Sequence, residues 1–393
     1  MASRLRWIAI GIFVLSSSLN YLDRLLLAAL APTLKLEFQL SNTQYGSLIS
    51  VFSIVYALMA PLAGWFIDRV GLNLGISISM TVWSLAGMAT GFTRTFTGLL
   101  ASRSLLGAAE AAGVPAAAKA DGLYLQPREL AFGSAMNQVG ITIGSVAAPL
   151  LVAVMAPLYG WRSVFLVCGA LGFVWIPLWW FTARKIPLYQ GPKPLVEVKV
   201  RELLRDRRIW GLALANALVM TLYTLWTNWT TLYFVDQFHL TEAATNRQFA
   251  WIPPVFATLG GFFGGWMSYR FARAGRDPFQ ARMRACWIAA GMLLLTAAVP
   301  LMPTPGWAAA AISVSFFWCL AISTNFYAMP IGFFGAARAA LGVSLLTGSY
   351  GLMQTFLSPL IGWMVDHFGF SPVCVALAAV PLAGVAVLRM ATR

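Results

Sequence analysis

Two stretches of this sequence place opposite full charges inside otherwise apolar segments. The first reads Asn20-Tyr21-Leu22-Asp23-Arg24 and lies near the centre of an apolar run from Trp7 to Ala31. The second places Arg103 and Glu110 seven residues apart in another apolar run. A charge at the centre of a membrane-length helix costs roughly 2.5–3.5 kcal/mol to insert, so such residues mark functional sites.

The chemistry of the first stretch suits an organic anion. Arg24 is a permanent cation whose planar fork matches a carboxylate. An unpaired arginine is unfavourable in a low dielectric, so an arriving anion, or Asp23 when the site is empty, should pair with it. Asp23 can be neutralised by a proton, which makes it a natural coupling residue. The alternative is a static ion pair that locks this helix to a neighbour.

Arg103 and Glu110 lie about two turns apart on one face of a helix. Between and beyond them come small residues such as Gly107 and Gly113, which let helices approach closely. A glutamate in this setting either faces a cavity and exchanges a proton, or belongs to a static network with Arg103. Both interpretations stay open from the residues alone.

The composition indicates which structural elements position these charged residues. The chain has 393 residues, 59% of them hydrophobic and only 10% charged, whereas soluble domains are about a quarter charged. Apolar segments of membrane length recur throughout, which predicts an all-α integral membrane protein. We expect twelve spans, at 7–31, 45–67, 73–92, 95–118, 131–158, 161–182, 209–235, 246–270, 280–301, 307–334, 340–365 and 370–390.

The net charge of +14 does not indicate nucleic-acid binding, because the basic residues are distributed by side of the membrane. With twelve spans, 21 of the 27 basic residues fall on the side of the N-terminus and four on the other. The positive-inside rule therefore predicts a multi-pass protein of the cell inner membrane with both termini cytoplasmic. The lipid bilayer is the expected partner, nucleic acid is not, and the chain is expected to act as a monomer.

The sequence repeats itself. Phe38-Gln-Leu-Ser41 matches Phe238-His-Leu-Thr241 at an offset of 200 residues, and Gly64-Trp65 matches Gly265-Trp266 at 201. A basic, proline-containing linker separates the copies. We expect a six-helix bundle over 1–182, a cytoplasmic linker over 183–208 and a second bundle over 209–393, with a substrate site near the membrane midplane.

Several motifs resemble one transporter family. Gly64-Trp-Phe-Ile-Asp-Arg-Val-Gly71 resembles the cytoplasmic loop of the major facilitator superfamily. Asn20 to Arg24 and Arg103 to Pro115 resemble its anion:cation symporter branch, which includes hexuronate and galactonate transporters. Trp251 to Ser268 is similar to the eighth span of the hexuronate carriers, although Thr258 stands where these often have an acid.

The resemblance implies a fold and a set of site residues. The fold is two pseudo-symmetric bundles of six helices. Asp23, Glu110 and Arg103 would serve proton coupling, and Arg24 would hold the substrate carboxylate. For substrate binding, the comparison with the family indicates Tyr21, Arg24, Tyr56, Gln138, Thr142, Asn325 and Ser349. Tyr223 is added from the residues themselves, because neutral hydrogen-bonding groups mixed with aromatics in the second half suit a polyhydroxylated chain. No cofactor is expected beyond protons as the coupling ion.

These observations predict a proton-coupled symporter that imports a small organic anion by alternating access, most simply a sugar acid such as a hexuronate or aldonate. The alternatives are an exporter of drugs or metabolites with the same fold, an organic-anion facilitator without proton coupling, and a membrane sensor that binds an anion without moving it. The sequence contains no nucleophile–base arrangement and no metal-ligand spacing. We therefore expect no enzyme activity.

Overall fold

The fold is helical throughout the part of the chain described by a computed structural model, which comprises residues 2–126, 129–186, 188, 200–334 and 336–392. Within these residues, nine helices are long and apolar enough to cross a membrane, and they coincide with nine of the twelve expected spans. The other three expected spans, at 95–118, 246–270 and 340–365, fall on helices that are broken, less apolar or only partly described.

Two compact units make up the chain. The first comprises Met1–Lys193 and His239–Trp251, so a short segment from the second half of the sequence packs with the first. Its elements are α1 (Ala2–Ala29), α2 (Ala31–Phe38), α3 (Asn42–Val70), α4 (Leu72–Gly91), α5 (Phe96–Glu110), α6 (Gly113–Tyr124), α7 (Leu130–Tyr159), α8 (Trp161–Ala183), α11 (Glu242–Thr245) and the π-helical turn η2 (Asn246–Ala250).

The second unit comprises Pro194–Phe238 and Ile252–Arg393. Its elements are α9 (Val200–Arg205), α10 (Arg207–Phe238), α12 (Ile252–Arg273), α13 (Pro278–Leu293), η3 (Leu294–Leu301), α14 (Pro305–Phe334), α15 (Ala336–Phe368), α16 (Phe370–Ala378) and α17 (Val380–Ala391). Most of the predicted linker, residues 187 and 189–199, lies outside the described residues.

The internal repeat is visible in the backbone. Gln39 and His239, the matching residues of the two Phe-x-Leu patterns, both adopt positive φ, at 51° and 54°. Ser41 then caps the next helix by accepting from the Gln44 N–H, and Thr241 accepts from the Ala244 N–H. Both copies use the same device, a left-handed residue followed by a hydroxyl N-cap, to end one helix and begin another.

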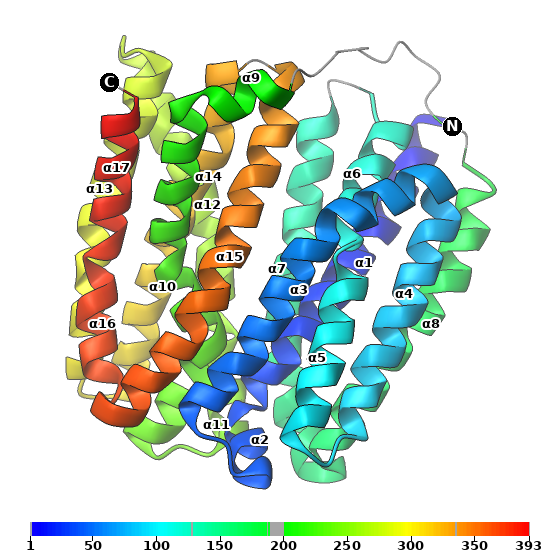
Figure 1. Cartoon of the computed structure of the whole chain (residues 1–393), viewed down its shortest axis with the longest axis vertical. Helices are drawn as coiled ribbons and strands as arrows, with labels where there is room; N and C mark the ends of the chain where they lie inside the picture. The colour runs from blue at the N-terminus through cyan, green and yellow to red at the C-terminus, as the bar shows by residue number, and fades with distance from the viewer. Residues whose placement is uncertain (1, 127–128, 187, 189–199, 335, 393) are drawn as a thin grey trace. The chain divides into compact units, whose positions relative to one another are not determined.

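Glycines bring the helices of the first unit into close contact. In Figure 1, α1 runs beside α7 and α3 beside α5. A Cβ atom added to Gly144 of α7 would lie only 2.1 Å from the Ser18 carbonyl oxygen of α1. One added to Gly107 of α5 would lie 2.7 Å from the Phe52 carbonyl oxygen of α3. Backbone-to-backbone contacts of this kind are typical of membrane helices, and they hold α7 close against α1 and α5 close against α3.

The fourth span differs from the expected single helix. It consists of α5, which ends at Glu110, and α6, which begins at Gly113. Pro115 has no N–H to donate to the carbonyl of residue 111, which favours a break at this point. The structure therefore places Glu110 at a helix end. It also extends the span to Tyr124, beyond the expected boundary at 118.

A lysine side chain of the same unit holds the loop after α3 in place. Lys119 of α6 donates to Asp68 Oδ1 and to the carbonyl oxygen of Ile67, both at 2.9 Å. The last carbonyls of a helix attract cations, so Lys119 caps the C-terminal end of α3. Asp68 thus pairs with a basic residue of the same unit.

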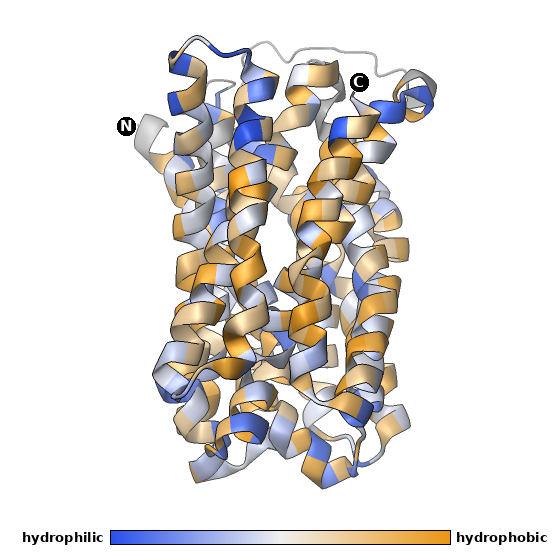
Figure 2. Cartoon of the chain, turned by 90° about the vertical axis from the view of Figure 1, so that its left-hand side faces the viewer, coloured by the Kyte–Doolittle hydropathy of each residue, from blue (hydrophilic) through white to orange (hydrophobic). Residues whose placement is uncertain are grey.

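The surface is apolar along the spans. Large hydrophobic side chains such as Leu58, Phe173, Leu214 and Phe262 are exposed. Figure 2 shows hydrophobic residues along the middle of the long helices and hydrophilic residues gathered toward their ends. Exposed apolar side chains on helices whose backbones bond internally suit contact with lipid. The protein is therefore a multi-pass membrane protein.

Candidate functional site

The charged residues of α1 and α5 meet in the first unit. The Nη2 atom of Arg24 lies 3.3 Å from Glu110 Oε2, and its Nε atom lies 3.4 Å from the same oxygen. Nη2 also donates to Asn20 Oδ1 at 3.3 Å. Glu110 is fully buried, whereas the Arg24 side chain is 19% exposed. The pair thus joins a buried acid to a cation that a ligand can reach.

Asp23 is not the partner of Arg24, contrary to the expectation for the empty site. Its side chain is 3% exposed, and Oδ1 makes no hydrogen bond to any described residue. Consecutive residues on a helix point in different directions. Because Arg24 points toward α5, Asp23 points elsewhere, and the acid that pairs with Arg24 comes from another helix.

Three aromatic rings surround the Arg24 guanidinium. Its central carbon lies 4.8 Å from the ring centres of Tyr21, Phe52 and Tyr56. Phe52 and Tyr56 stack one helical turn apart on α3, with ring centres separated by 5.8 Å. Rings at such distances attract a cation and keep water from its faces. The rings therefore cover the faces of the guanidinium and leave its N–H donors directed along the edge of the fork.

Phe52 also contacts the second arginine of the site. The Arg103 guanidinium lies 4.7 Å from the Phe52 ring centre, so one ring packs against both cations. Arg103 is 2% exposed, and its Nε and Nη1 atoms make no hydrogen bond within the described residues. No salt bridge joins Arg103 to Glu110 in this part of the chain. The static intrahelical pair is absent, and two buried acids balance two arginines.

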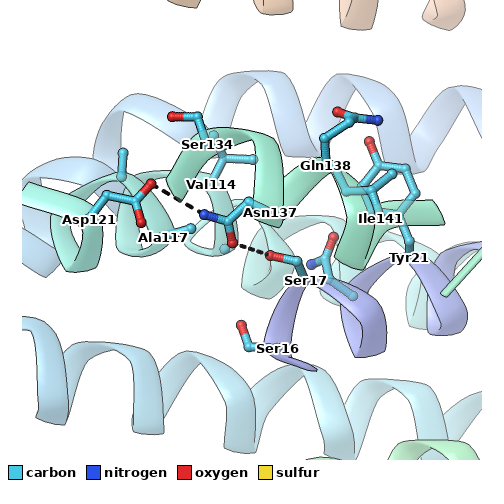
Figure 3. Close-up of a pocket in the computed structure, with 13 residues that line it drawn as sticks. Ser16, Ser17, Tyr21, Val114, Ala117, Asp121, Ser134, Asn137, Gln138 and Ile141 are labelled. Carbon is cyan, nitrogen blue, oxygen red and sulfur yellow. Dashed lines mark hydrogen bonds between the residues drawn. The ribbon is translucent and has the colours of Figure 1, made fainter. Parts of the chain in front are cut away.

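A cavity of about 190 Å³ lies next to this group. Asn20, Tyr21 and Gln138 line it, together with polar residues of α6 and α7 (Figure 3). Thr142, one turn further along α7, does not line the cavity; its hydroxyl donates to the Gln138 carbonyl at 3.1 Å. Of the two residues predicted on α7, Gln138 is therefore the one that lines this cavity.

The residues predicted in the second unit are engaged within that unit. Tyr223 packs against the ring of Phe316, with centres 5.4 Å apart. Ser349 donates to the Leu346 carbonyl at 2.8 Å. Asn325 is 2% exposed; its amide donates to carbonyl oxygens of α12 and α14, and its Oδ1 accepts from Ser268. Asn325 thus joins two helices, and it lines a separate cavity of about 290 Å³.

Sequence reasoning missed two residues of the first unit. Phe52 lies one turn before Tyr56, and that spacing was the available signal. Asp121, whose side chain is 4% exposed, lines the same cavity as Asn20. It falls past the expected end of its span, where an acid is usually a surface residue, so nothing in the pattern singled it out.

The fold and the charged site together define a class, the multi-pass membrane transporters whose helix bundles enclose a small-ligand site. The chain belongs to the Major Facilitator Superfamily, since the family model matches residues 13–340. It has the twelve-helix fold of that family and is a transporter, not an enzyme. The predictions of family, fold and absence of enzyme activity are confirmed.

Known proteins are similar over nearly the whole chain. The hexuronate transporter of Escherichia coli strain K12 is 30% identical over 98% of this chain and 93% of its own length. The galacturonate transporter of Dickeya chrysanthemi is 31% identical over 68% of this chain and 83% of its own. The crystal structure of a bacterial homolog of the human lysosomal transporter Spinster, inward-facing and occupied, superimposes with a TM-score of 0.80 at 21% identity. That match covers 98% of this chain and 95% of the other. At 21% identity, it shows that the two proteins share a fold and nothing more.

Proposed function

We propose that the protein is a proton-coupled symporter of the bacterial inner membrane, with both termini cytoplasmic, that imports a sugar acid such as a hexuronate or an aldonate. The observation that carries this proposal is the ion pair between Arg24 and Glu110. The arginine suited to a substrate carboxylate is held by a group that a proton can neutralise. The names of the bacterial relatives support a sugar acid as the substrate.

The pair suggests how a proton and an anion exchange. While Glu110 is ionised, it occupies the Arg24 fork through Oε2. Protonation removes that charge, and the guanidinium then has no anionic partner in a low-dielectric setting. A substrate carboxylate, which can take two parallel N–H donors, replaces Glu110. Anion and proton therefore enter the site together.

The surrounding rings and the second acid complete this scheme. Tyr21, Phe52 and Tyr56 keep the guanidinium in place while its partner changes. Asp23, buried in the same group, provides a second carboxyl for a proton. In the empty site, the two ionised acids balance the two arginines. When the substrate is bound and both acids are protonated, the site carries one more positive charge than in that empty state. Rearrangement of the bundles therefore does not carry a bare anion through the membrane.

Transport into proteoliposomes tests the proposal. With an inward-directed proton gradient, the wild-type protein should accumulate labelled galacturonate or galactonate, and collapse of the gradient should abolish accumulation. Arg24→Ala should not transport. Glu110→Gln should exchange labelled for unlabelled substrate across the membrane but should not accumulate it.

The control variant is Glu37→Gln, which changes an acid in an exposed pair with Arg162 and should transport like wild type. Equal wild-type uptake with and without a gradient would indicate an uncoupled facilitator and contradict the proposal. Efflux driven by an opposite gradient, with no uptake, would indicate an exporter.

A further inference from the structure

A buried acid in the first unit has no assigned role. Asp121 of α6 is 4% exposed and lines the same cavity as Asn20. Its Oδ2 atom accepts from Asn137 Nδ2 at 3.3 Å, whereas Oδ1 makes no hydrogen bond to any described residue. The salt bridges of the described residues do not include it. A carboxylate in this position needs a donor, because burial without one is costly.

The acid is held in a fixed orientation. Asn137 of α7 donates to Asp121 and accepts from the Ser17 hydroxyl of α1 at 3.1 Å, so three helices share one chain of hydrogen bonds (Figure 3). Gly133 of α7 lies against the carboxyl group, since a Cβ atom there would be 2.8 Å from Oδ1. Asp121 is thus held in a fixed position in the wall of the cavity.

The cavity has a carboxyl group at one end, and the residues at its other end adjoin the Arg24 guanidinium. Figure 3 places Asp121 at one end and Tyr21 at the other, with Asn137 between them. At the Tyr21 end, Asn20 contacts the Arg24 guanidinium and its Nδ2 atom has no hydrogen-bond partner among the described residues. A ligand in this cavity would therefore have a cation near one end and a carboxylate at the other.

The length of this path fits an open-chain sugar acid. Arg24 reaches back to the level of Asn20, and Ser17 lies three residues further, about 4.5 Å along the helix. Two more hydrogen bonds of about 3 Å each lead through Asn137 to Asp121. The path from guanidinium to carboxylate, including the width of the Asn137 amide, is therefore on the order of 10–15 Å, which an extended six-carbon acid and the hydrogen bonds at its two ends can cover.

We propose that Asp121 determines specificity at the end of the substrate distant from its carboxylate. It accepts hydrogen bonds from terminal hydroxyl groups and repels a second carboxylate. The preferred substrates are then sugar acids with one carboxylate, and dicarboxylic aldarates of the same length are rejected. This inference rests on the proposed function, because it takes Arg24 as the contact for the first carboxylate.

Two physical effects give the selectivity. A like charge placed opposite a buried charge is strongly unfavourable and serves to exclude wrong ligands. A buried acceptor left without its donor also penalises an analogue that lacks the hydroxyl. A substrate bound in the reverse direction would bring its carboxylate to Asp121 and leave Arg24 unpaired, so the same acid sets the orientation.

Equilibrium binding to the purified full chain in detergent at pH 8 tests this. The three ligands to compare are galactonate, its dicarboxylic counterpart galactarate, and 6-deoxygalactonate, which lacks the terminal hydroxyl group. Wild type should bind galactonate at least about tenfold more tightly than either analogue. Asp121→Asn removes the charge and keeps a hydrogen-bonding oxygen, so galactarate should gain affinity until the two acids differ by less than about threefold.

Asp68→Asn is the matched control, because Asp68 is an acid of the same unit whose side chain is 77% exposed; it should keep the wild-type selectivity. Equal wild-type binding of galactonate, galactarate and 6-deoxygalactonate would overturn the inference even if Asp121→Asn failed to fold. A folded Asp121→Asn protein with unchanged selectivity would overturn it as well. If wild type bound none of a wider set of sugar acids, the proposed function itself would fail.

Discussion

Arg24 and Glu110 are joined through a single carboxylate oxygen. Both Nη2 and Nε of the arginine approach Oε2, at 3.3 and 3.4 Å, while Oε1 makes no hydrogen bond to a described residue. Arginine binds carboxylates best through two parallel bonds of about 2.7–2.9 Å. The internal pair is thus longer and less complete than the pair that a free carboxylate can form, which favours exchange.

Replacing Arg24 by lysine tests whether sugar-acid binding needs only the positive charge or also the planar guanidinium group. Lysine keeps the positive charge but lacks the planar fork, so Arg24→Lys should bind sugar acids about tenfold more weakly. Arg24→Ala should lose about 30-fold or more, because it removes both the positive charge and the N–H donors that contact the carboxylate. Titration calorimetry on both variants measures this. Wild-type affinity in Arg24→Lys would show that the fork is not the carboxylate contact.

The charge on Glu110 should compete with the substrate. In wild type, sugar-acid affinity should rise as the pH falls, because a protonated Glu110 no longer occupies Arg24. Glu110→Gln removes the charge at every pH, so it should bind at least as tightly as wild type at low pH and lose the pH dependence. Binding curves between pH 5.5 and 8 check this. A Glu110→Gln protein with the wild-type pH profile would assign the coupling proton to another group, with Asp23 the first to examine.

The Phe52 ring should matter for binding as well as packing. Each cation–π contact is worth about 0.5–2 kcal/mol, and Phe52 makes one with Arg24 and one with Arg103. Phe52→Leu keeps an apolar side chain but loses both contacts, so affinity should fall roughly three- to tenfold. Phe165→Leu is the control, since that ring is also buried but packs against Trp161. Equal effects of the two changes on affinity would reduce Phe52 to a packing residue.

The sequence was sufficient for the features that depend on local pattern. Membrane-length apolar runs indicate the spans. Asp23, Arg24, Arg103 and Glu110 are recognisable from the sequence alone, because they are charged residues within apolar segments. These four residues do gather in one unit. Their presence in apolar segments is a strong signal because the cost of inserting a charge does not depend on the details of packing.

The pairing within that group could not be predicted in the same way. Which acid meets Arg24 depends on the rotation of α1 and on the position of α5, which the contact of Gly107 with the Phe52 backbone holds close to α3. Asp121 was missed for a related reason. The hydropathy of the fourth span fades near residue 118, but α6 continues to Tyr124 and carries the acid into a cavity.

Glu242 should make the stability of the protein depend on pH. It lies between spans, and its carboxylate accepts from the Thr33 N–H at 2.9 Å, as α11 lies beside α2 (Figure 1). Burial raises the pKa of Glu242, although the hydrogen bond from Thr33 partly opposes the shift. The folded chain therefore binds a proton more tightly than the unfolded chain does, and stability falls as the pH rises through the window between the two pKa values.

Glu242→Gln keeps the acceptor oxygen and removes the charge. Its thermal midpoint should exceed that of wild type near pH 8, and the difference should disappear below about pH 4, where the carboxyl is protonated in both states. Glu242→Ala loses the acceptor and should melt below Glu242→Gln at both pH values. Parallel curves for wild type and Glu242→Gln across this range would contradict the assignment.

The contact that sets the distance between α3 and α5 provides a last test of the site. A methyl group at position 107 would lie 2.7 Å from the Phe52 carbonyl oxygen, and backbone cannot move aside as a flexible side chain can. Gly107→Ala should therefore destabilise the protein by about 1–3 kcal/mol. It should also weaken sugar-acid binding, because α5 would carry Arg103 and Glu110 away from the Phe52 ring of α3, which packs against Arg24 and Arg103. Gly122→Ala has no atom within 4 Å of the new Cβ and should be neutral or slightly stabilising, since alanine favours helices over glycine by about 1 kcal/mol. Thermal unfolding and calorimetric binding on both variants measure the two effects, and a Gly107→Ala protein with wild-type affinity would mean that the site does not depend on this helix contact.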